Sequence, residues 1–168
     1  MKPNIIFIIC HDLGRELGCY GDESMDSPNL DSLAGQGVRF TNAFCAATPC
    51  SPSRVCISTG MYSHSNGLTG LINLNFDMPD RMTTAKYLNE LGYETYLFGL
   101  QHEKKDYDKL GYGHIKKSQR CHTVAADVEA FLLSAEAKAK PFFINAGFIE
   151  THLPFQQAEY VKVDPAKV

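Results

Sequence analysis

The segment Cys50-Ser51-Pro52-Ser53-Arg54 brings together residue types that can bind and attack an anionic group. Ser51 suits a helix N-cap and Pro52 suits the first helical position, so the spacing predicts a helix that begins just after Cys50. Cys50 would then face unpaired backbone N–H groups and the positive end of the helix dipole, which favour sulfate or phosphate. Arg54 adds a permanently charged guanidinium. The alternative interpretation is a plain helix cap with a structural cysteine.

Acidic and imidazole side chains follow three predicted strands. The strands and the residues after them are 4–10 with His11 and Asp12, 93–100 with His102, and 141–148 with Glu150 and His152. In an open parallel sheet, ligands bind outside the carboxyl ends of the strands, so this pattern predicts a catalytic rim. Taken singly, Asp12 could instead cap a turn, and either His102 or His152 could be a structural histidine.

The elements that must position these side chains alternate along the chain. Residues 4–10 form an apolar run typical of a strand that is buried on both faces. The other predicted elements are a helix from Ser27-Pro28 that ends at Gly35 and Gly37, a strand or extended segment at 38–44, helices at 83–91 and 123–138, and a polar loop at 104–117. Strands that alternate with helices predict an α/β fold with a mainly parallel sheet.

Composition narrows the classes of partner. The 168 residues predict one domain, and 16 basic against 19 acidic residues give a net charge of −3. This charge gives no reason to expect nucleic acid or a membrane as a partner. No leader or transmembrane run is visible, which predicts a cytoplasmic protein, or a periplasmic or secreted one if a leader was removed. None of the six cysteines forms a C-x-x-C pair, so those other than Cys50 are expected to be small core or half-buried side chains.

Together these motifs resemble the type I sulfatases, whose C-x-P-S-R signature is matched from Cys50 to Arg54. The other matching segments, in order, are Pro3-Asn4-Ile5-Ile6-Phe7-Ile8, Ser27-Pro28-Asn29-Leu30-Asp31-Ser32-Leu33-Ala34, Gly37-Val38-Arg39-Phe40-Thr41-Asn42-Ala43-Phe44, Thr59-Gly60 and His64-Ser65-Asn66-Gly67. The resemblance is nearest to the branch that includes N-sulfoglucosamine sulfohydrolases. It implies an alkaline-phosphatase-like α/β/α sandwich, of which residues 1–168 are the N-terminal portion of the catalytic domain.

The resemblance also implies an activity, hydrolysis of sulfate esters or sulfamates on a sugar. In this family a maturase oxidises the cysteine, here Cys50, to formylglycine, whose hydrate is the nucleophile and faces a divalent cation, usually calcium. Arg54 would orient the hydrate, and His102 would remove a proton from it. His152 would contact the substrate and assist the leaving group. Asp12 matches a metal-binding aspartate.

The sequence departs from the family pattern at two positions. His11 stands where the family usually has the first aspartate of an Asp-Asp pair, so His11 is a candidate metal ligand of a softer kind. Zn²⁺ or Mn²⁺ then becomes an alternative to Ca²⁺. Leu100 stands where the family usually has a lysine, and Gln101 is expected to supply a neutral donor to the substrate instead.

Two other functions fit the same residues. A formylglycine-dependent phosphonate or phosphodiester hydrolase needs the same anion site and the same Lewis acid. A non-catalytic sulfatase-like binding module would explain the acid missing at position 11. The family's later metal ligands and its second lysine lie beyond residue 168, so the 168-residue piece is expected to be inactive by itself. The sequence does not predict the substrate sugar or the oligomeric state.

Overall fold

The computed structural model describes residues 2–118 and 120–152. These residues form two compact units, each described here by itself. The sheet unit comprises the chain up to His11 together with Cys45–Ile149, and the α1 unit comprises Asp12–Phe44 together with the residues that begin at Glu150.

The sheet unit is built on four parallel strands in the order β1-β4-β2-β3. The strands are β1 (Ile5–Cys10), β2 (Glu94–Gly99), β3 (His114–Lys116) and β4 (Phe142–Phe148). The predictions of a parallel sheet and of strands at 4–10, 93–100 and 141–148 are confirmed. The prediction of a loop throughout 104–117 is wrong, because β3 lies inside it. A three-residue strand is too short to show a period of two in its sequence.

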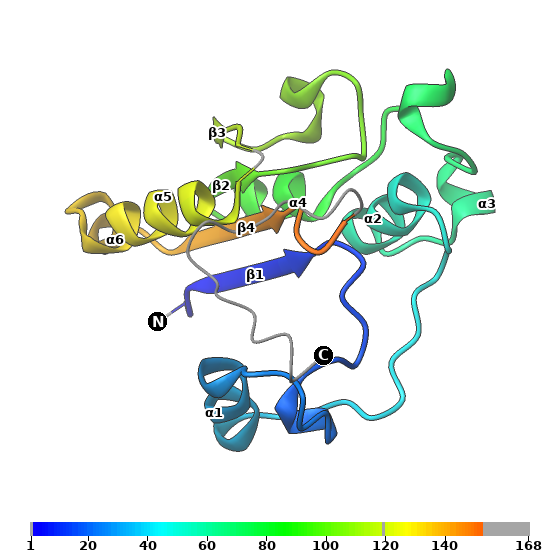
Figure 1. Cartoon of the computed structure of the whole chain (residues 1–168). Helices are drawn as coiled ribbons and strands as arrows, with labels where there is room; N and C mark the ends of the chain where they lie inside the picture. Colours follow the sequence, from blue (N-terminus) through cyan, green and yellow to red (C-terminus); the bar gives the residue numbers. More distant parts are fainter. Residues whose placement is uncertain (1, 119, 153–168) are drawn as a thin grey trace. The chain divides into compact units, whose positions relative to one another are not determined.

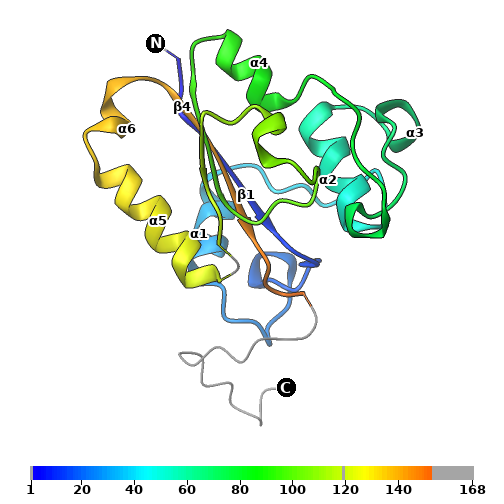
Figure 2. The same cartoon turned by 90° about the horizontal axis from the view of Figure 1, so that it is seen from above.

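Helices cover both faces of this sheet (Figures 1 and 2). On one side lie α5 (Cys121–Leu133) and α6 (Glu136–Ala139), and on the other side lie α2 (Cys50–Thr59) and α4 (Thr84–Glu90). The core beneath α5 joins Val124 and Phe131 of the helix to residues of β2 and β4 such as Tyr96 and Ile144. The layering is therefore helix, sheet, helix, as the α/β prediction requires.

Strand β1 is less buried than its sequence predicts. Ile6 and Ile8 are 45% and 54% exposed, whereas their partners in β4, Ile144 and Ala146, are 0% and 2% exposed. The side chains of Ile5, Phe7 and Ile9, which point to the opposite face, line an apolar hollow that they share with α2 and α4. The prediction that residues 4–10 are buried on both faces is therefore wrong, because the face that carries Ile6 and Ile8 is left exposed. In the described part of the chain β1 is also an edge strand, since it pairs with β4 alone.

Several helix boundaries differ from the predicted ones. Helix α1 (Pro28–Gln36) begins at Pro28 as predicted, but it passes through Gly35 and ends at Gly37. The single helix predicted at 123–138 is divided into α5 and α6 by Ser134, whose backbone is extended. No strand forms at 38–44. The remaining short elements are η1 (Gly18–Tyr20), α3 (Ser63–Asn66), η2 (Ile72–Leu74) and η3 (Tyr107–Leu110).

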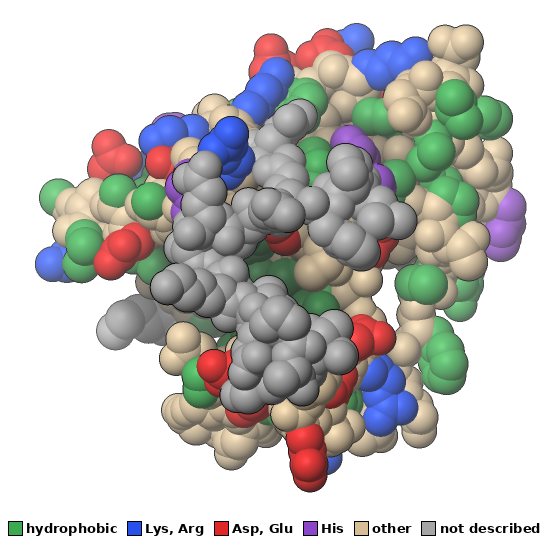
Figure 3. Space-filling view, in the orientation of Figure 1, with side chains coloured by type: hydrophobic (Ala, Val, Ile, Leu, Met, Phe, Trp, Pro, Cys, Tyr) green, Lys and Arg blue, Asp and Glu red, His purple; other side chains and the backbone are tan. Residues whose placement is uncertain are grey.

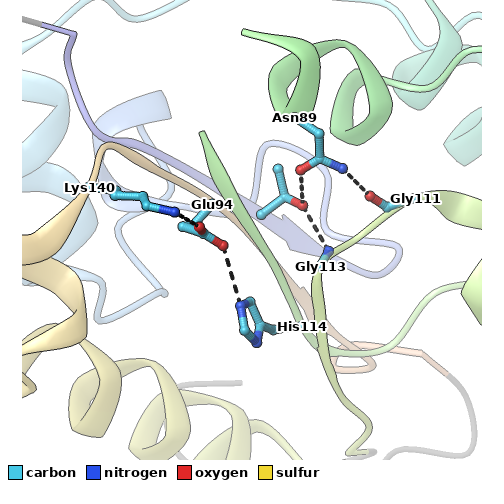
Figure 4. A network of polar contacts seen from close by, with 7 residues as sticks. Asn89, Glu94, Gly111, Gly113, His114 and Lys140 are labelled. Carbon is cyan, nitrogen blue, oxygen red and sulfur yellow. Dashed lines mark hydrogen bonds and ion pairs between the residues drawn. The ribbon is translucent and has the colours of Figure 1, made fainter. Parts of the chain in front are cut away.

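Two polar clusters lie near the amino-terminal end of β2 (Figure 4), and one of them joins this end of the strand to helix α4. Thr83 caps α4 through its side chain, which accepts from the backbone N–H of Lys86 at 3.2 Å. The Thr95 hydroxyl donates to Asn89 at 2.8 Å and accepts from the Gly113 N–H at 2.9 Å, which fixes the entry to β3. The other cluster joins Glu94 at the start of β2 to Lys140 and His114.

Charges of both signs are interspersed on the face drawn in Figure 3, without a large patch of one sign. This agrees with the small net charge of −3. Among the helices that the structure describes, none has the length and the apolar character needed to cross a membrane.

Candidate active site

Cys50 is the first residue of α2 rather than the residue before it. Pro49 takes the N-cap position with extended backbone, and the helix runs from Cys50 to Thr59. The N-cap predicted at Ser51 is therefore wrong: this buried side chain instead accepts a hydrogen bond from the backbone N–H of Ile72 at 3.3 Å. The half-buried Cys50 still lies at the positive end of the α2 dipole.

Arg54 lies one turn further along α2, on the same face as Cys50, and is only 5% exposed. Its counter-charge is Glu103, which is 2% exposed. Burial raises the pKa of the Glu103 carboxyl, and the positive charge of Arg54 opposes that rise. Buried charges are rarely tolerated without an opposite charge nearby, so Arg54 and Glu103 stabilise each other electrostatically near the start of α2.

Glu103 is a residue that the sequence analysis missed. Its carboxylate accepts a hydrogen bond from the backbone N–H of His102 at 2.9 Å, so it links the position of His102 to the charge of Arg54. The half-buried Tyr112 lies against the same region, and its pKa is raised first by burial of its hydroxyl and then by the negative charge of Glu103. A glutamate in a polar loop is normally exposed, so nothing in the sequence marks Glu103 as buried.

Gln101 organises the loop that carries His102. Its side chain is 1% exposed, and its carbonyl oxygen accepts from the backbone N–H groups of Glu103 at 2.6 Å and Lys104 at 3.1 Å. Its amide nitrogen donates to the carbonyl of Lys104 at 2.7 Å. The side chain of Lys104 is also buried and donates to the carbonyl of Met78. Gln101 therefore shapes this loop, and its expected contact with substrate stays a prediction.

Gly99 turns the chain out of β2 toward this loop. Its φ of +85° lies in the left-handed region, which L side chains rarely adopt. A Cβ atom at Gly99 would also lie 2.2 Å from the carbonyl oxygen of Gly147 in β4. Glycine is therefore required at the point where the strand ends and the loop of His102 begins.

His11, Cys50 and His102 converge at the carboxyl end of the sheet. One ligand atom from each, a ring nitrogen or the sulfur, lies within 4.8 Å of the others. The rings of His11 and His102 meet edge to face, with 6.0 Å between centroids and an interplanar angle of 81°. His11 is 4% exposed, and the other two side chains are half-buried. The expected convergence of β1, β2 and α2 at one rim is therefore present for these three residues.

Asp12 and His152 belong to the α1 unit. The Nε2 atom of His152 lies 4.0 Å from Oδ2 of Asp12, and both side chains are substantially exposed. Asp12 has a φ of +57°, an uncommon conformation that aspartate tolerates better than most residues. The roles of Asp12 as a metal ligand and of His152 as an acid stay predictions.

The donors in the sheet unit do not fit a calcium ion. Calcium takes six to eight oxygen ligands. The cluster of His11, Cys50 and His102 offers two imidazole nitrogens and one sulfur, which are softer donors that suit zinc. Asp12 is the only carboxylate among the predicted ligands, and it can supply part of an oxygen shell at most.

Comparison with known proteins places the chain in a family. The sulfatase family matches residues 3–167, so this chain belongs to the sulfatase family. It is 38% identical over 102 residues to an N-acetylglucosamine-6-O-sulfatase of Bacteroides thetaiotaomicron, a match that covers 60% of this chain and 18% of the relative. The chain spans about a fifth of the length of the curated relatives it matches.

Solved structures share its fold. The structure of BT4656 in complex with its substrate D-glucosamine-2-N,6-O-disulfate matches with a TM-score of 0.77 and 26% identity, over 91% of this chain and 35% of the other. A phosphonate monoester hydrolase of Agrobacterium radiobacter matches with a TM-score of 0.64 over 95% of this chain and 43% of the other. At 19% identity, this second match shows the fold alone. The predicted alkaline-phosphatase-like α/β fold is confirmed.

Proposed function

We propose that the protein hydrolyses sulfate esters or sulfamates on saccharides, with residue 50 as the nucleophile. The observation that carries the proposal is the position of Cys50-Ser51-Pro52-Ser53-Arg54 at the start of α2, in a chain of the sulfatase family. A sugar substrate is supported by the similarity to an N-acetylglucosamine-6-O-sulfatase and to a protein bound to a sulfated glucosamine.

In this proposal Cys50 is converted to formylglycine by a maturase. The aldehyde hydrate supplies a hydroxyl nucleophile, which a thiol at this position does not. The N-terminal end of α2 favours the negative charge of a sulfate group, because its first backbone N–H groups lack partners within the helix. Arg54 adds a fixed positive charge one turn away, and burial strengthens its field.

His102 serves as the proton acceptor for residue 50. Its ring lies in the cluster with Cys50, and its backbone is held by Glu103 and by the loop that Gln101 organises. Asp12 as a ligand of a divalent metal ion and His152 as a donor to the leaving group enter the proposal through the family resemblance. No step is assigned to calcium, because the donors in the sheet unit do not fit it.

The second candidate is hydrolysis of a phosphonate or phosphodiester. It is favoured by the shared fold of the phosphonate monoester hydrolase, and an anion site at a helix N-terminus serves both groups. The two candidates differ in the charge and the bonding of the group attacked, so parallel assays separate them.

The test uses the full-length protein made in a host with a maturation system. Mass spectrometry of the peptide that spans residues 40–54 should show formylglycine at position 50 and unmodified thiols elsewhere. Cleavage of aryl sulfates, sulfamates and phosphodiesters should favour a sulfur substrate. Cys50→Ala should lower turnover by at least about 10³-fold, as loss of a nucleophile does. Cys45→Ala, which changes an exposed cysteine, is the matched control. An active protein with an unmodified Cys50 thiol would overturn the mechanism.

A second test concerns the metal. Isothermal titration of calcium into the full-length protein and into residues 1–168 should show much weaker binding, or none, in the shorter chain. The reason is that Asp12 and residue 50 supply only part of an oxygen shell. Tight calcium binding by residues 1–168 alone would show that the ligands are wrongly assigned.

A further inference from the structure

The cluster of His11, Cys50 and His102 has a feature that sulfate hydrolysis does not require. All three side chains belong to the sheet unit: His11 follows β1, Cys50 begins α2, and His102 lies beyond β2. Their ligand atoms lie within 4.8 Å of one another. The position at residue 11 is occupied by a nitrogen donor rather than an oxygen donor, which changes the metal that the cluster prefers.

The dimensions of the cluster suit tetrahedral zinc. With bonds of about 2.0–2.1 Å to nitrogen and about 2.3 Å to sulfur, the ligand atoms of such a site lie roughly 3.3–3.6 Å apart. The separations here, at most 4.8 Å, come within about an ångström of that range, which small rotations of the side chains can supply. Three protein ligands with a fourth position open to water is a common zinc arrangement.

Two positive features lie near the cluster, the N-terminal end of α2 and Arg54, and Glu103 offsets the charge of Arg54 in part. When zinc is bound, the negatively charged sulfur of Cys50 lies at the end of α2 that favours negative charge. The partial exposure of Cys50 and His102 leaves a route by which an ion can enter.

We infer that His11, Cys50 and His102 bind one zinc ion for as long as residue 50 is a cysteine. The Cys50 thiol gives up its proton to solvent and the sulfur bonds to Zn²⁺, while each imidazole donates the lone pair of one nitrogen. Conversion of Cys50 removes the sulfur and therefore the site. Only this last statement rests on the proposed function; zinc binding by the unconverted protein does not.

The first experiment titrates zinc into the full-length, unconverted protein, in competition with a chromophoric chelator. One equivalent should bind, and Co²⁺ in its place should give a thiolate-to-metal charge-transfer band. Cys50→Ser, His11→Ala and His102→Ala should each weaken zinc binding by at least about 100-fold, since changes to outer partners alone cost 10–100-fold. His64→Ala and Cys45→Ser alter a histidine and a cysteine outside the cluster, and should bind as the parent does.

A second measurement needs no variant, so it holds even if a substitution disturbs folding. Alkylation of the parent protein, followed by peptide mass spectrometry, should be at least about tenfold slower at Cys50 when zinc is present, because the metal-bound sulfur is protected. The rate at the exposed Cys45 should not change. Equal rates at Cys50 with and without zinc, or a cobalt complex without the thiolate band, would overturn the inference.

The outcomes also separate this inference from the proposed function. Zinc binding by the unconverted protein, together with a converted protein that cleaves no sulfate ester, would refute the sulfatase proposal and leave the zinc site standing. Sulfatase activity after conversion, together with no zinc binding before it, would refute the zinc site and leave the sulfatase proposal standing.

Discussion

The two ends of β2 carry glutamates in opposite electrostatic situations. Glu94 begins the strand at the surface, where it bonds Lys140 at 2.6 Å and lies 3.5 Å from His114 (Figure 4). Lys140 lowers the pKa of Glu94, with a smaller contribution from His114. Glu103 lies beyond the other end, where burial raises the pKa of its carboxyl although Arg54 is nearby.

The opposite pKa shifts of Glu94 and Glu103 show that the two ends of β2 differ in their access to water. At the amino end, water remains available, so a charged partner decides the direction of the pKa shift. At the carboxyl end, the effect of burial on the pKa of Glu103 outweighs the opposing effect of Arg54. An acidic side chain is therefore kept there at a cost in stability. Such a cost is typical of functional sites, where groups are held in place before the substrate binds. The following predictions test this contrast, from the largest expected effect to the smallest.

Arg54→Ala should cause the largest loss of stability. It leaves Glu103 buried without the nearby positive charge, and the cost should be up to about 3 kcal/mol, the lower end of the range for breaking a buried ion pair, because the two side chains interact without direct contact. Because Glu103 can avoid the cost by taking up a proton, the loss should be greater at high pH than at low pH. Urea unfolding at several pH values measures it. A loss no larger than that of Lys140→Ala would mean that Glu103 is not truly isolated from water.

Glu103→Gln should change the pH dependence of stability. A carboxyl group whose folded-state pKa is raised stabilises the fold fully below its unfolded pKa of about 4.3 and loses that contribution as the pH rises through the folded pKa. The free energy of unfolding of the parent should therefore fall, relative to Glu103→Gln, as the pH rises above about 4.3. Thermal unfolding of both proteins across this range is the measurement. Parallel curves would contradict the prediction.

Lys140→Ala should have the smallest effect, with the opposite pH dependence. The pKa of Glu94 is lowered, so its contribution is present above the unfolded pKa and is lost as the pH falls through the lowered value. Because the Lys140 side chain is mostly exposed and that of Glu94 is about a third exposed, the effect should be about 0.2–1 kcal/mol and should shrink in high salt. An effect as large as that of Arg54→Ala, or one insensitive to salt, would remove the contrast between the two ends.

The fold could be predicted where a pattern repeats. Three strands appear as apolar runs, α4 is long enough to show the helical period, and Pro28 marks the start of α1. The break at Ser134 could not be predicted, because the helical pattern of apolar residues continues across it. The exposure of Ile6 and Ile8 in β1 could not be predicted either, since it depends on which distant elements cover each face of the sheet.

The candidate site also contains residues that the sequence marks and one that it does not. The residue types at Cys50, Arg54 and His102 carry local signals, a helix start and the end of a strand, and the structure brings them to one end of the sheet. The buried position of Glu103 depends on contacts with α2, more than 40 positions earlier in the chain, which no local pattern records. Long-range burial of a charge is therefore what the sequence analysis missed.

The strand order has a consequence for synthesis of the chain. Strand β1 finds its neighbour in β4, and the hydrogen bond between Asn4 and Phe142 spans 138 positions. At a translation rate of about 5–20 residues per second, β1 leaves the ribosome roughly 7–28 s before β4 can pair with it. During that interval an apolar run with unpaired backbone groups is available to other chains, which is the situation that chaperones relieve. Efficient production of this protein should therefore depend on how the first ten residues are shielded while the remainder is made.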